Sequence, residues 1–161
     1  MKKNVGVIFL FLATLVCQAN PTDTTQLKAR PVFGKEAATI CALLPRYHYR
    51  RMAFNDSLSS VVFDKYFEEL DNSKVYFLAS DVQSFEKYRT KLDDLTKAGI
   101  VDPAFEIYKV FRERYRARLK EVAANLVAQN FDYGTDEYYE TERDKATWAK
   151  TPAELNAAND G

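Results

Sequence analysis

The sequence predicts an all-α protein, a helical bundle of about four to six helices with one long helix, after an N-terminal signal peptide. Apolar side chains recur every three or four residues along three stretches, which is the spacing of one face of a helix. Asn, Ser or Asp stands where each stretch begins, as an N-cap residue does. Glycine and proline number only five each among 161 residues, which is typical of chains that prefer regular elements to loops.

Residues 1–19 have the parts of a secretory signal peptide. Two lysines follow the first methionine, residues 5–16 are almost all apolar, and residues 17–19 resemble a small-x-small cleavage site. A membrane-spanning anchor needs around 20 apolar residues, more than this run provides. A lipoprotein signal ending at Cys17 is the other alternative. The sequence therefore predicts an exported protein, and it leaves lipid anchoring or membrane association open.

The first part of the exported chain is predicted to be a flexible leader followed by short helices. Residues 20–34 are rich in Thr, Pro and charge and lack apolar periodicity. Residues 35–44 favour a short helix that Pro45 would end, because proline pushes the preceding residue out of the α region. Residues 47–54 alternate aromatic, basic and apolar side chains, and a second helical segment is the preferred interpretation. The helical domain is expected to cover residues 35–161.

Two amphipathic helices are expected next, over residues 56–70 and 80–98. Asn55 is a suitable N-cap for the first helix, and Gly99 supplies the left-handed residue at which the second would end. The apolar side of the first comprises Leu58, Val61, Val62, Phe63, Tyr66, Phe67 and Leu70, and that of the second comprises Val82, Phe85, Tyr88, Leu92 and Leu95.

The stretch between these two helices, residues 70–81, is expected to stop one helix and start the next. Asp71 and the two residues after it have short polar side chains that compete with a helical ladder. Residues 75–79 form a short apolar run that must be buried against its flanks. Ser80 and Gln83 form a possible capping box for the next helix, and Asp81 places a negative charge at its positive end.

The longest helix is predicted from Asp102 to about residue 129. Asp102 is placed at the N-cap and Pro103 at the first helical position, where its missing N–H costs nothing. About 27 residues would span roughly 40 Å, with an apolar face that needs partners along its whole length. The sequence also predicts a turn at residues 130–135 and a short helix within residues 136–145. A last helix is expected to start at Pro152, with Thr151 as its N-cap. Because this last helix begins so close to the end of the sequence, we expect the chain to be a part cut from a longer polypeptide.

Charge and composition argue against several kinds of chemistry. Lys and Arg equal Asp and Glu at 23 each, whereas nucleic-acid binding needs a cationic surplus, so no nucleic-acid partner is expected. Cys41 is the only cysteine outside the signal peptide and is expected to be a buried small hydrophobe. His48, the only histidine, lies between two tyrosines, which favours a structural hydrogen bond.

The candidates for catalysis are few. Glu137, Glu140, Glu142 and Asp144 form an acidic cluster that could perform glycosidic acid and base chemistry or bind calcium, although a charge-paired surface is the simpler interpretation. A hydrolase using Glu140 and Glu142 stays as a third hypothesis. The sequence contains no Gly-rich phosphate loop and no Gly-x-Ser-x-Gly motif. It therefore predicts no catalytic, metal or cofactor-binding residue.

Three separated blocks resemble the N-terminal helical region of the tail-specific, or C-terminal processing, serine proteases of bacterial envelopes. The blocks are residues 47–50 with His48, residues 70–81, and residues 144–156 around Trp148. Their order and spacing are similar to those of the family, and the resemblance covers roughly residues 45–157. It implies the helical frame of such an enzyme, ahead of a PDZ module and a core with a serine nucleophile and a lysine base.

That catalytic core has no counterpart in residues 1–161, so the resemblance gives no catalytic residue here. The block residues would have structural roles: His48 in a hydrogen bond, Phe77, Leu78 and Trp148 in packing, and Asp71, Ser80 and Asp81 in turn and cap. The implied partners are the rest of the protease, protein substrates and an adaptor lipoprotein. The implied location is the bacterial periplasm or cell envelope, with association with the inner membrane left open. The alternative is a stand-alone envelope module that binds or adapts without protease activity.

Overall fold

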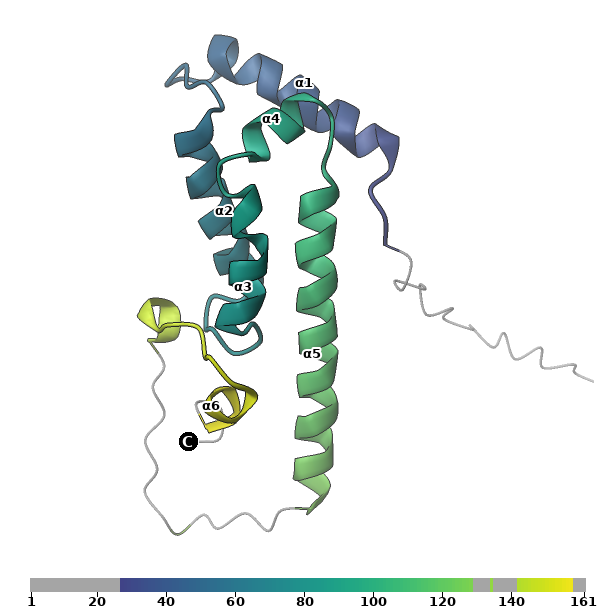
Figure 1. Cartoon of the computed structure of the whole chain (residues 1–161), viewed down its shortest axis with the longest axis vertical. Coiled ribbons are helices and arrows are strands. Elements are labelled where there is room, and N and C mark those ends of the chain that lie inside the picture. The colour runs from purple at the N-terminus through teal and green to yellow at the C-terminus, as the bar shows by residue number, and fades with distance from the viewer. Residues whose placement is uncertain (1–26, 129–133, 135–141, 158–161) are drawn as a thin grey trace, which may run out of the picture.

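The computed structural model describes residues 27–128, 134 and 142–157, and over these ranges it contains helices and no strand (Figure 1). The α-helices are α1 (Pro31–Tyr47), α2 (Asp56–Leu70), α3 (Ala79–Phe85), α4 (Leu92–Lys97), α5 (Asp102–Ala128) and α6 (Pro152–Ala157). Two single-turn 3-10 helices are η2 (Glu86–Tyr88) and η3 (Arg143–Lys145). The predicted all-α fold with one long helix is confirmed.

The helices form a bundle along one side of α5. Figure 1 shows α2 and α3 running beside α5, and α1 crossing one end of the bundle next to α4. The segment that contains η3 and α6 lies near the other end of α5. These partners cover the first part of the apolar face of α5, whereas Leu119 and Leu126 nearer its C-terminal end are exposed.

The core of the bundle is built mainly from phenylalanine rings. The buried residues that form it are Phe63 and Phe67 of α2, Phe77 of the loop before α3, Phe85 of α3 and Ile107 of α5. The Phe67 ring centre lies 5.0 Å from that of Phe63 and 5.0 Å from that of Phe77. Tilted and edge-on rings at this distance attract each other beyond the gain from burial alone. The loop that carries Phe77 therefore belongs to the core.

Helix α1 is longer than predicted at both ends. It begins at Pro31, inside the predicted leader, because proline at the first helical position lacks only an N–H that would find no helical partner. It also continues through Pro45 to Tyr47, so the predicted stop before Pro45 is wrong. Pro45 lies in the last turn, where one missing backbone hydrogen bond is least disruptive. The second helical segment expected over residues 47–54 is wrong as well, since residues 48–55 are turn and coil.

The single helix expected over residues 80–98 is divided into α3, η2 and α4. The division lets α4 turn toward α1 and α2, where the Asp93 amide donates to the Ser59 hydroxyl at 2.9 Å. A contact between residues far apart in the sequence has here overridden local helical periodicity. The predicted end at Gly99 is confirmed, with φ of +76° and the Ile100 amide donating to the Leu95 carbonyl.

The predictions for the later helices agree with the structure at the boundaries that it describes. Helix α5 has the expected 27 residues and begins at Asp102, the residue that was predicted as its N-cap. Thr151 accepts a hydrogen bond from the Glu154 amide at 3.1 Å, as an N-cap residue does. Most of the short helix predicted within 136–145 lies outside the described residues, and Arg143–Lys145 form one 3-10 turn.

Asn55 supplies a test of the N-cap assignment for α2. Its side-chain oxygen accepts from the Leu58 amide at 3.1 Å. Replacing Asn55 with Ala is expected to lower the free energy of unfolding by about 1 kcal/mol, because a helix N–H loses its partner. Urea denaturation followed by circular dichroism measures this change. Ser57→Ala, at an exposed position in the first turn of α2, is the control and should change stability by less than about 0.5 kcal/mol.

Candidate functional site

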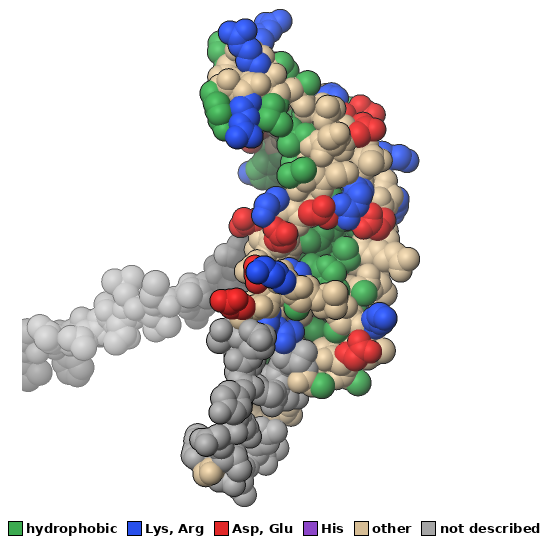
Figure 2. Space-filling model, turned by 90° about the vertical axis from the view of Figure 1, so that its left-hand side faces the viewer, with side chains coloured by type: hydrophobic (Ala, Val, Ile, Leu, Met, Phe, Trp, Pro, Cys, Tyr) green, Lys and Arg blue, Asp and Glu red, His purple; other side chains and the backbone are tan. Residues whose placement is uncertain are grey.

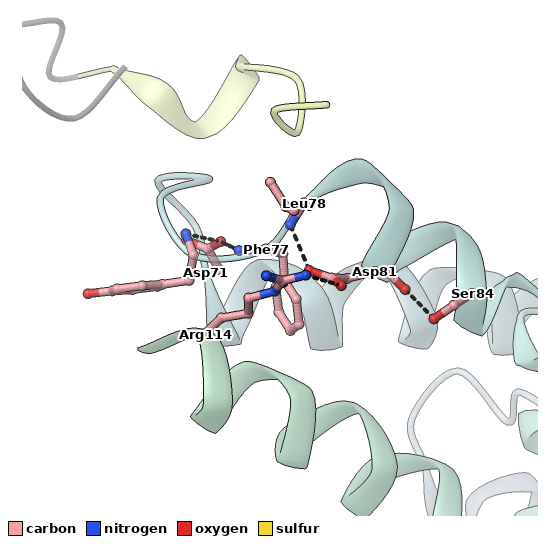
Figure 3. A network of polar contacts seen from close by, with 7 residues as sticks. Asp71, Phe77, Leu78, Asp81, Ser84 and Arg114 are labelled. Carbon is pink, nitrogen blue, oxygen red and sulfur yellow. Dashed lines mark hydrogen bonds and ion pairs between the residues drawn. The ribbon is translucent and has the colours of Figure 1, made fainter. Parts of the chain in front are cut away.

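The loop of residues 71–78, between α2 and α3, is organised by one buried carboxylate. Asp71 is 2% exposed, and one of its oxygens accepts from the Val75 amide at 2.8 Å. The other accepts from the amides of Tyr76 and Phe77, both at 2.9 Å (Figure 3). Hydrogen bonds to an ionised acceptor are stronger than those between neutral groups. Asp71 thus fixes the backbone that inserts Phe77 into the core.

A second carboxylate, that of Asp81, joins this loop to α5. Its Oδ2 accepts from the Leu78 amide at 2.9 Å, and Arg114 donates to both of its oxygens at 2.9 Å (Figure 3). This hydrogen bonding raises the pKa of the Arg114 guanidinium and so favours its charged form. A bidentate pair of this kind restrains orientation as well as distance. The N-terminus of α3 is therefore held against α5.

The predicted capping box of Ser80 and Gln83 is wrong. Helix α3 begins at Ala79 with Leu78 at the N-cap, and Asp81 occupies the third helical position. Asp81 therefore makes the return bond to the N-cap amide that was expected from Gln83. The physical reason is the ion pair with Arg114, which fixes Asp81 near the start of α3 and leaves Ser80 exposed.

The segment of residues 142–157, called the strap here, binds across the loop of residues 71–78. The Ala79 amide donates to the Ala149 carbonyl at 2.8 Å, within a single parallel β-bridge between Leu78 and Ala149. Lys74 Nζ donates to the Asp144 carbonyl at 3.1 Å. Arg143 Nε donates to the Ser73 carbonyl at 3.0 Å. The strap is thus attached to the loop through backbone oxygens on both sides.

Trp148 is the apolar anchor of the strap. Its ring centre lies 5.8 Å from that of Phe77 and 6.4 Å from that of Phe67, in edge-on arrangements. The Lys74 ammonium lies 5.0 Å from the centre of the indole ring, a distance suited to a cation–π interaction. Lys74 is only 7% exposed and adopts φ of +55°. The structure places Phe77, Leu78 and Trp148 together, in contact with the region that Asp71 and Asp81 fix.

The far end of the strap is held by α5. Asn156 Nδ2 donates to Glu121 Oε1 at 2.6 Å, and Arg118 Nη1 lies 3.3 Å from both Glu121 Oε2 and Asn156 Oδ1. Leu155 of α6 is 9% exposed and packs inward. Two separate sets of contacts, at the loop and at α5, therefore fix the path of the strap.

A buried polar network joins α2 to α4. The hydroxyl of Ser59 donates to Asp93 Oδ1 at 3.0 Å and accepts from the Asp93 amide at 2.9 Å. Lys97 Nζ donates to Asp93 Oδ2 at 2.7 Å. A serine, a carboxylate and a lysine in contact suggest a hydrolase site at first sight.

The environment of this network argues against nucleophilic catalysis. Ser59 is 0% exposed, so no substrate reaches its oxygen. The hydrogen bond to Asp93 raises the pKa of Lys97 and thereby favours the charged ammonium, whereas a base must be neutral. The network is best described as a structural clamp between two helices.

The clamp gives a prediction for acid stability. The hydrogen bond from Lys97 holds the pKa of Asp93 below its usual value of about 3.8. A carboxyl group with a lowered folded-state pKa stabilises the protein above its unfolded pKa, and this contribution is lost as pH falls through the folded value. Asp93→Asn is therefore expected to flatten the decline in stability below about pH 4. Urea midpoints at pH 7, 4 and 3 measure this, and an unchanged decline would contradict the role of Asp93.

An apolar pocket of about 350 Å³ lies between α1, α2, α4 and α5. Its walls include Ile40, Cys41, Val62, Phe63 and Ile107, and no charged side chain is among its lining residues. Burial raises the pKa of the Cys41 thiol, so the thiol stays protonated and little reactive. The pocket can accommodate an apolar group and has no charged side chain to pair with a charged one.

The remaining predicted residues lie apart from the strap or outside the described residues. His48 Nδ1 accepts from the Arg50 amide at 3.3 Å, and its ring lies against Tyr49 at the end of α1. Cys17, Glu137 and Glu140 fall outside the described residues, so the acidic-cluster hypothesis is not tested. The residues that the structure describes contain no group of three or more His, Cys, Asp or Glu placed to hold a metal.

Sequence reasoning missed the partners that complete the site. Arg114 lies 33 positions from Asp81, and Lys74 lies 70 positions from Asp144. Periodicity reports only neighbours along one element. The one available signal was the position of Asp81 next to a short apolar run, which identified the residue but not its partner.

Comparison with known proteins identifies the family. The model of the tail-specific protease N-terminal domain matches residues 40–159. The chain is also 30% identical to the tail-specific protease of Haemophilus influenzae over 170 residues, which cover 97% of this chain and 24% of that protein. The chain thus spans about a quarter of the length of this relative. With its helical bundle and strap, the chain belongs to the family of tail-specific protease N-terminal domains.

Proposed function

We propose that the chain is the non-catalytic N-terminal helical domain of an exported tail-specific serine protease. In this role it frames the binding of protein substrates or of an adaptor lipoprotein during the proteolysis of envelope proteins. The observation that carries the proposal is the strap. Because the strap is attached at Ala149 and at Asn156, any domain that follows it would start from a fixed place on the bundle.

The buried clamp supports a non-catalytic role. Ser59 is inaccessible and Lys97 is held charged by Asp93, so these residues do not provide a nucleophile and base. Peptide hydrolysis is assigned to a PDZ-linked core with a serine and a lysine, outside residues 27–157. The domain would contribute position and shape, which matter because small displacements of a bound substrate slow a reaction strongly.

The first test uses the 161-residue chain alone. It is incubated with a protein substrate that ends in an apolar C-terminal tail, and products are followed by mass spectrometry. No cleavage above the buffer control is expected. Cleavage that disappears in Ser59→Ala would contradict the proposal, since it would place a working nucleophile inside the bundle.

The second test measures framing directly, in the polypeptide that also carries a PDZ module and the protease core. Trp148→Ala is expected to slow cleavage of a folded, tail-bearing protein about tenfold more than cleavage of a short peptide, because the strap loses its anchor. Leu119→Ala, at a 51% exposed position on α5, is the control and should slow neither. Equal slowing of both substrates by Trp148→Ala would refute a framing role.

A stand-alone envelope module is the second candidate. The core of Phe63, Phe67, Phe77, Phe85 and Ile107 is complete within the described residues, which favours cooperative folding without further domains. This candidate predicts that the exported chain binds a partner from envelope extract. The reading frame beyond the codon for Gly161 separates the two: a protease core supports the first candidate, and a stop codon without such a core supports the second.

A further inference from the structure

The charges of the chain are unevenly distributed between its first helix and the helices that follow. Residues 27–51 carry six basic side chains and one acidic one, whereas residues 52–104 carry six basic and ten acidic ones. The net charge of zero for the whole chain conceals this separation. Helix α1 and the turn after it are therefore strongly cationic.

The cationic side chains of this region have no acidic partner in the part of the chain that the structure describes. They are Lys28, Arg30, Lys35, Arg46, Arg50 and Arg51, and none of them forms a salt bridge with a described residue. Two of them contact aromatic rings instead: the guanidinium of Arg30 lies over Phe33 and that of Arg50 over Tyr49. Their positive charge is consequently available to an external partner.

The same region exposes an unusual amount of apolar surface. Seven of the fourteen exposed large hydrophobic residues of the described chain lie within residues 27–52. They are Leu27, Val32, Ile40, Leu43, Tyr47, Tyr49 and Met52. The two tyrosines are 76% and 81% exposed. Aromatic rings beside cationic side chains are typical of surfaces that lie at a membrane interface.

The apolar and basic groups occupy the outer side of α1. Gly34 and Cys41 face inward and are buried. Two pairs of residues lie three helical turns apart and so fall on one side of the helix: Val32 with Leu43, and Lys35 with Arg46. Figure 2 shows Lys and Arg side chains close to hydrophobic ones at the end of the molecule formed by α1 and the turn after it.

We propose that α1 and residues 48–52 form a docking surface for an anionic lipid bilayer. The cations would contact lipid head groups, while Leu43, Tyr47 and Met52 would enter the interfacial layer. Charge complementarity favours this occupant, because clusters of four to eight Lys and Arg residues on amphipathic helices suit anionic lipids. The acidic side chains of residues 52–104 lie on the following helices and would disfavour binding through those elements. The inference rests on the proposed export of the chain.

The test measures binding of the exported form, without residues 1–19, to vesicles. Vesicles of phosphatidylglycerol and phosphatidylcholine are compared with vesicles of phosphatidylcholine alone by cosedimentation. Binding is expected only to the anionic vesicles and should weaken as salt is raised. The combined variant Arg46→Glu, Arg50→Glu and Arg51→Glu is expected to weaken binding at least about tenfold.

A matched variant controls for net charge. Lys91→Glu, Lys109→Glu and Lys120→Glu change charge by the same amount at exposed positions outside α1 and the turn after it, and binding should fall less than about twofold. Leu43→Ser with Tyr47→Ser tests the apolar part and should also weaken binding, while circular dichroism confirms that each variant is folded. Equal losses in both charge variants would overturn the proposal.

Other occupants of this surface give different results. Absence of vesicle binding, with concentration-dependent dimers in sedimentation, would overturn the proposal in favour of a second copy of the chain. Absence of both vesicle binding and dimers would overturn the proposal in favour of a protein partner. The cleavage experiments of the proposed function do not depend on lipid, so failure of one proposal is distinguishable from failure of the other.

Discussion

Asp71→Ala is expected to lower the free energy of unfolding by about 4 kcal/mol. The variant removes the acceptor of three backbone amides, those of Val75, Tyr76 and Phe77. Hydrogen bonds to a charged group contribute about 1.5 to 3 kcal/mol each. Water can reach the first two amides in part, since Val75 and Tyr76 are half-buried, but Phe77 is 0% exposed. The expected loss therefore lies below the sum of three full bonds.

The measurement is urea denaturation followed by the fluorescence of Trp148, the only tryptophan. Its ring contacts Phe77, so the signal reports the packing of the loop that Asp71 fixes. Asp94→Ala is the control, because the Asp94 side chain is 81% exposed and the change should be below about 0.5 kcal/mol. A loss of less than about 1 kcal/mol in Asp71→Ala would contradict the organising role given to this carboxylate.

The same variant should loosen the strap. The loop of residues 71–78 donates to and accepts from the strap through Lys74 and Ser73, so disorder in the loop removes these attachments. Hydrogen exchange of the Ala79 amide, which is bonded to the Ala149 carbonyl, is expected to become faster than in the control. Protection that is retained at Ala79 would show that Trp148 packing holds the strap without the loop.

Sequence reasoning succeeded where a structural signal is local. Asn55, Thr151 and Gly99 act within one helical turn of their own position, and a short polar side chain or a glycine carries that information by itself. The length of α5 followed from an apolar repeat without interruption. Each of these features depends on the backbone next to the residue.

The features that sequence reasoning missed depend on distant partners. The break between α3 and α4 follows from the contact of Asp93 with Ser59, 34 positions away. The start of α3 depends on Arg114, on another helix. Helix α1, which packs on α4, extends past Pro45, whose one missing backbone hydrogen bond falls in the last turn. Helical periodicity carries no information about such distant contacts. It therefore predicts that a helix is present but not the residues at which the helix begins and ends.

Helix α1 packs on α4 where Gly34 and Gly99 approach each other closely. Gly34→Ala tests this packing through the sign of the change in the free energy of unfolding. A methyl group at Gly34 would lie 2.0 Å from the backbone oxygen of Gly99. In a helix with free space, Gly to Ala stabilises by roughly 0.5 to 1 kcal/mol. Here the obstacle is a backbone atom that no side-chain rotation can move. The free energy of unfolding is therefore expected to fall by about 3 kcal/mol, as in an overpacked core.

Gly99→Ala separates this steric effect from backbone strain. At Gly99 the nearest atom to an added methyl group is 3.4 Å away, but φ is +76°, so only the left-handed conformation costs energy, about 1 kcal/mol. Thermal and urea denaturation of both variants should place Gly34→Ala clearly below Gly99→Ala. If Gly34→Ala were stabilising, α1 would not lie against α4 in solution. The apolar pocket between these helices and the cationic surface of α1 would then lose the support that positions them.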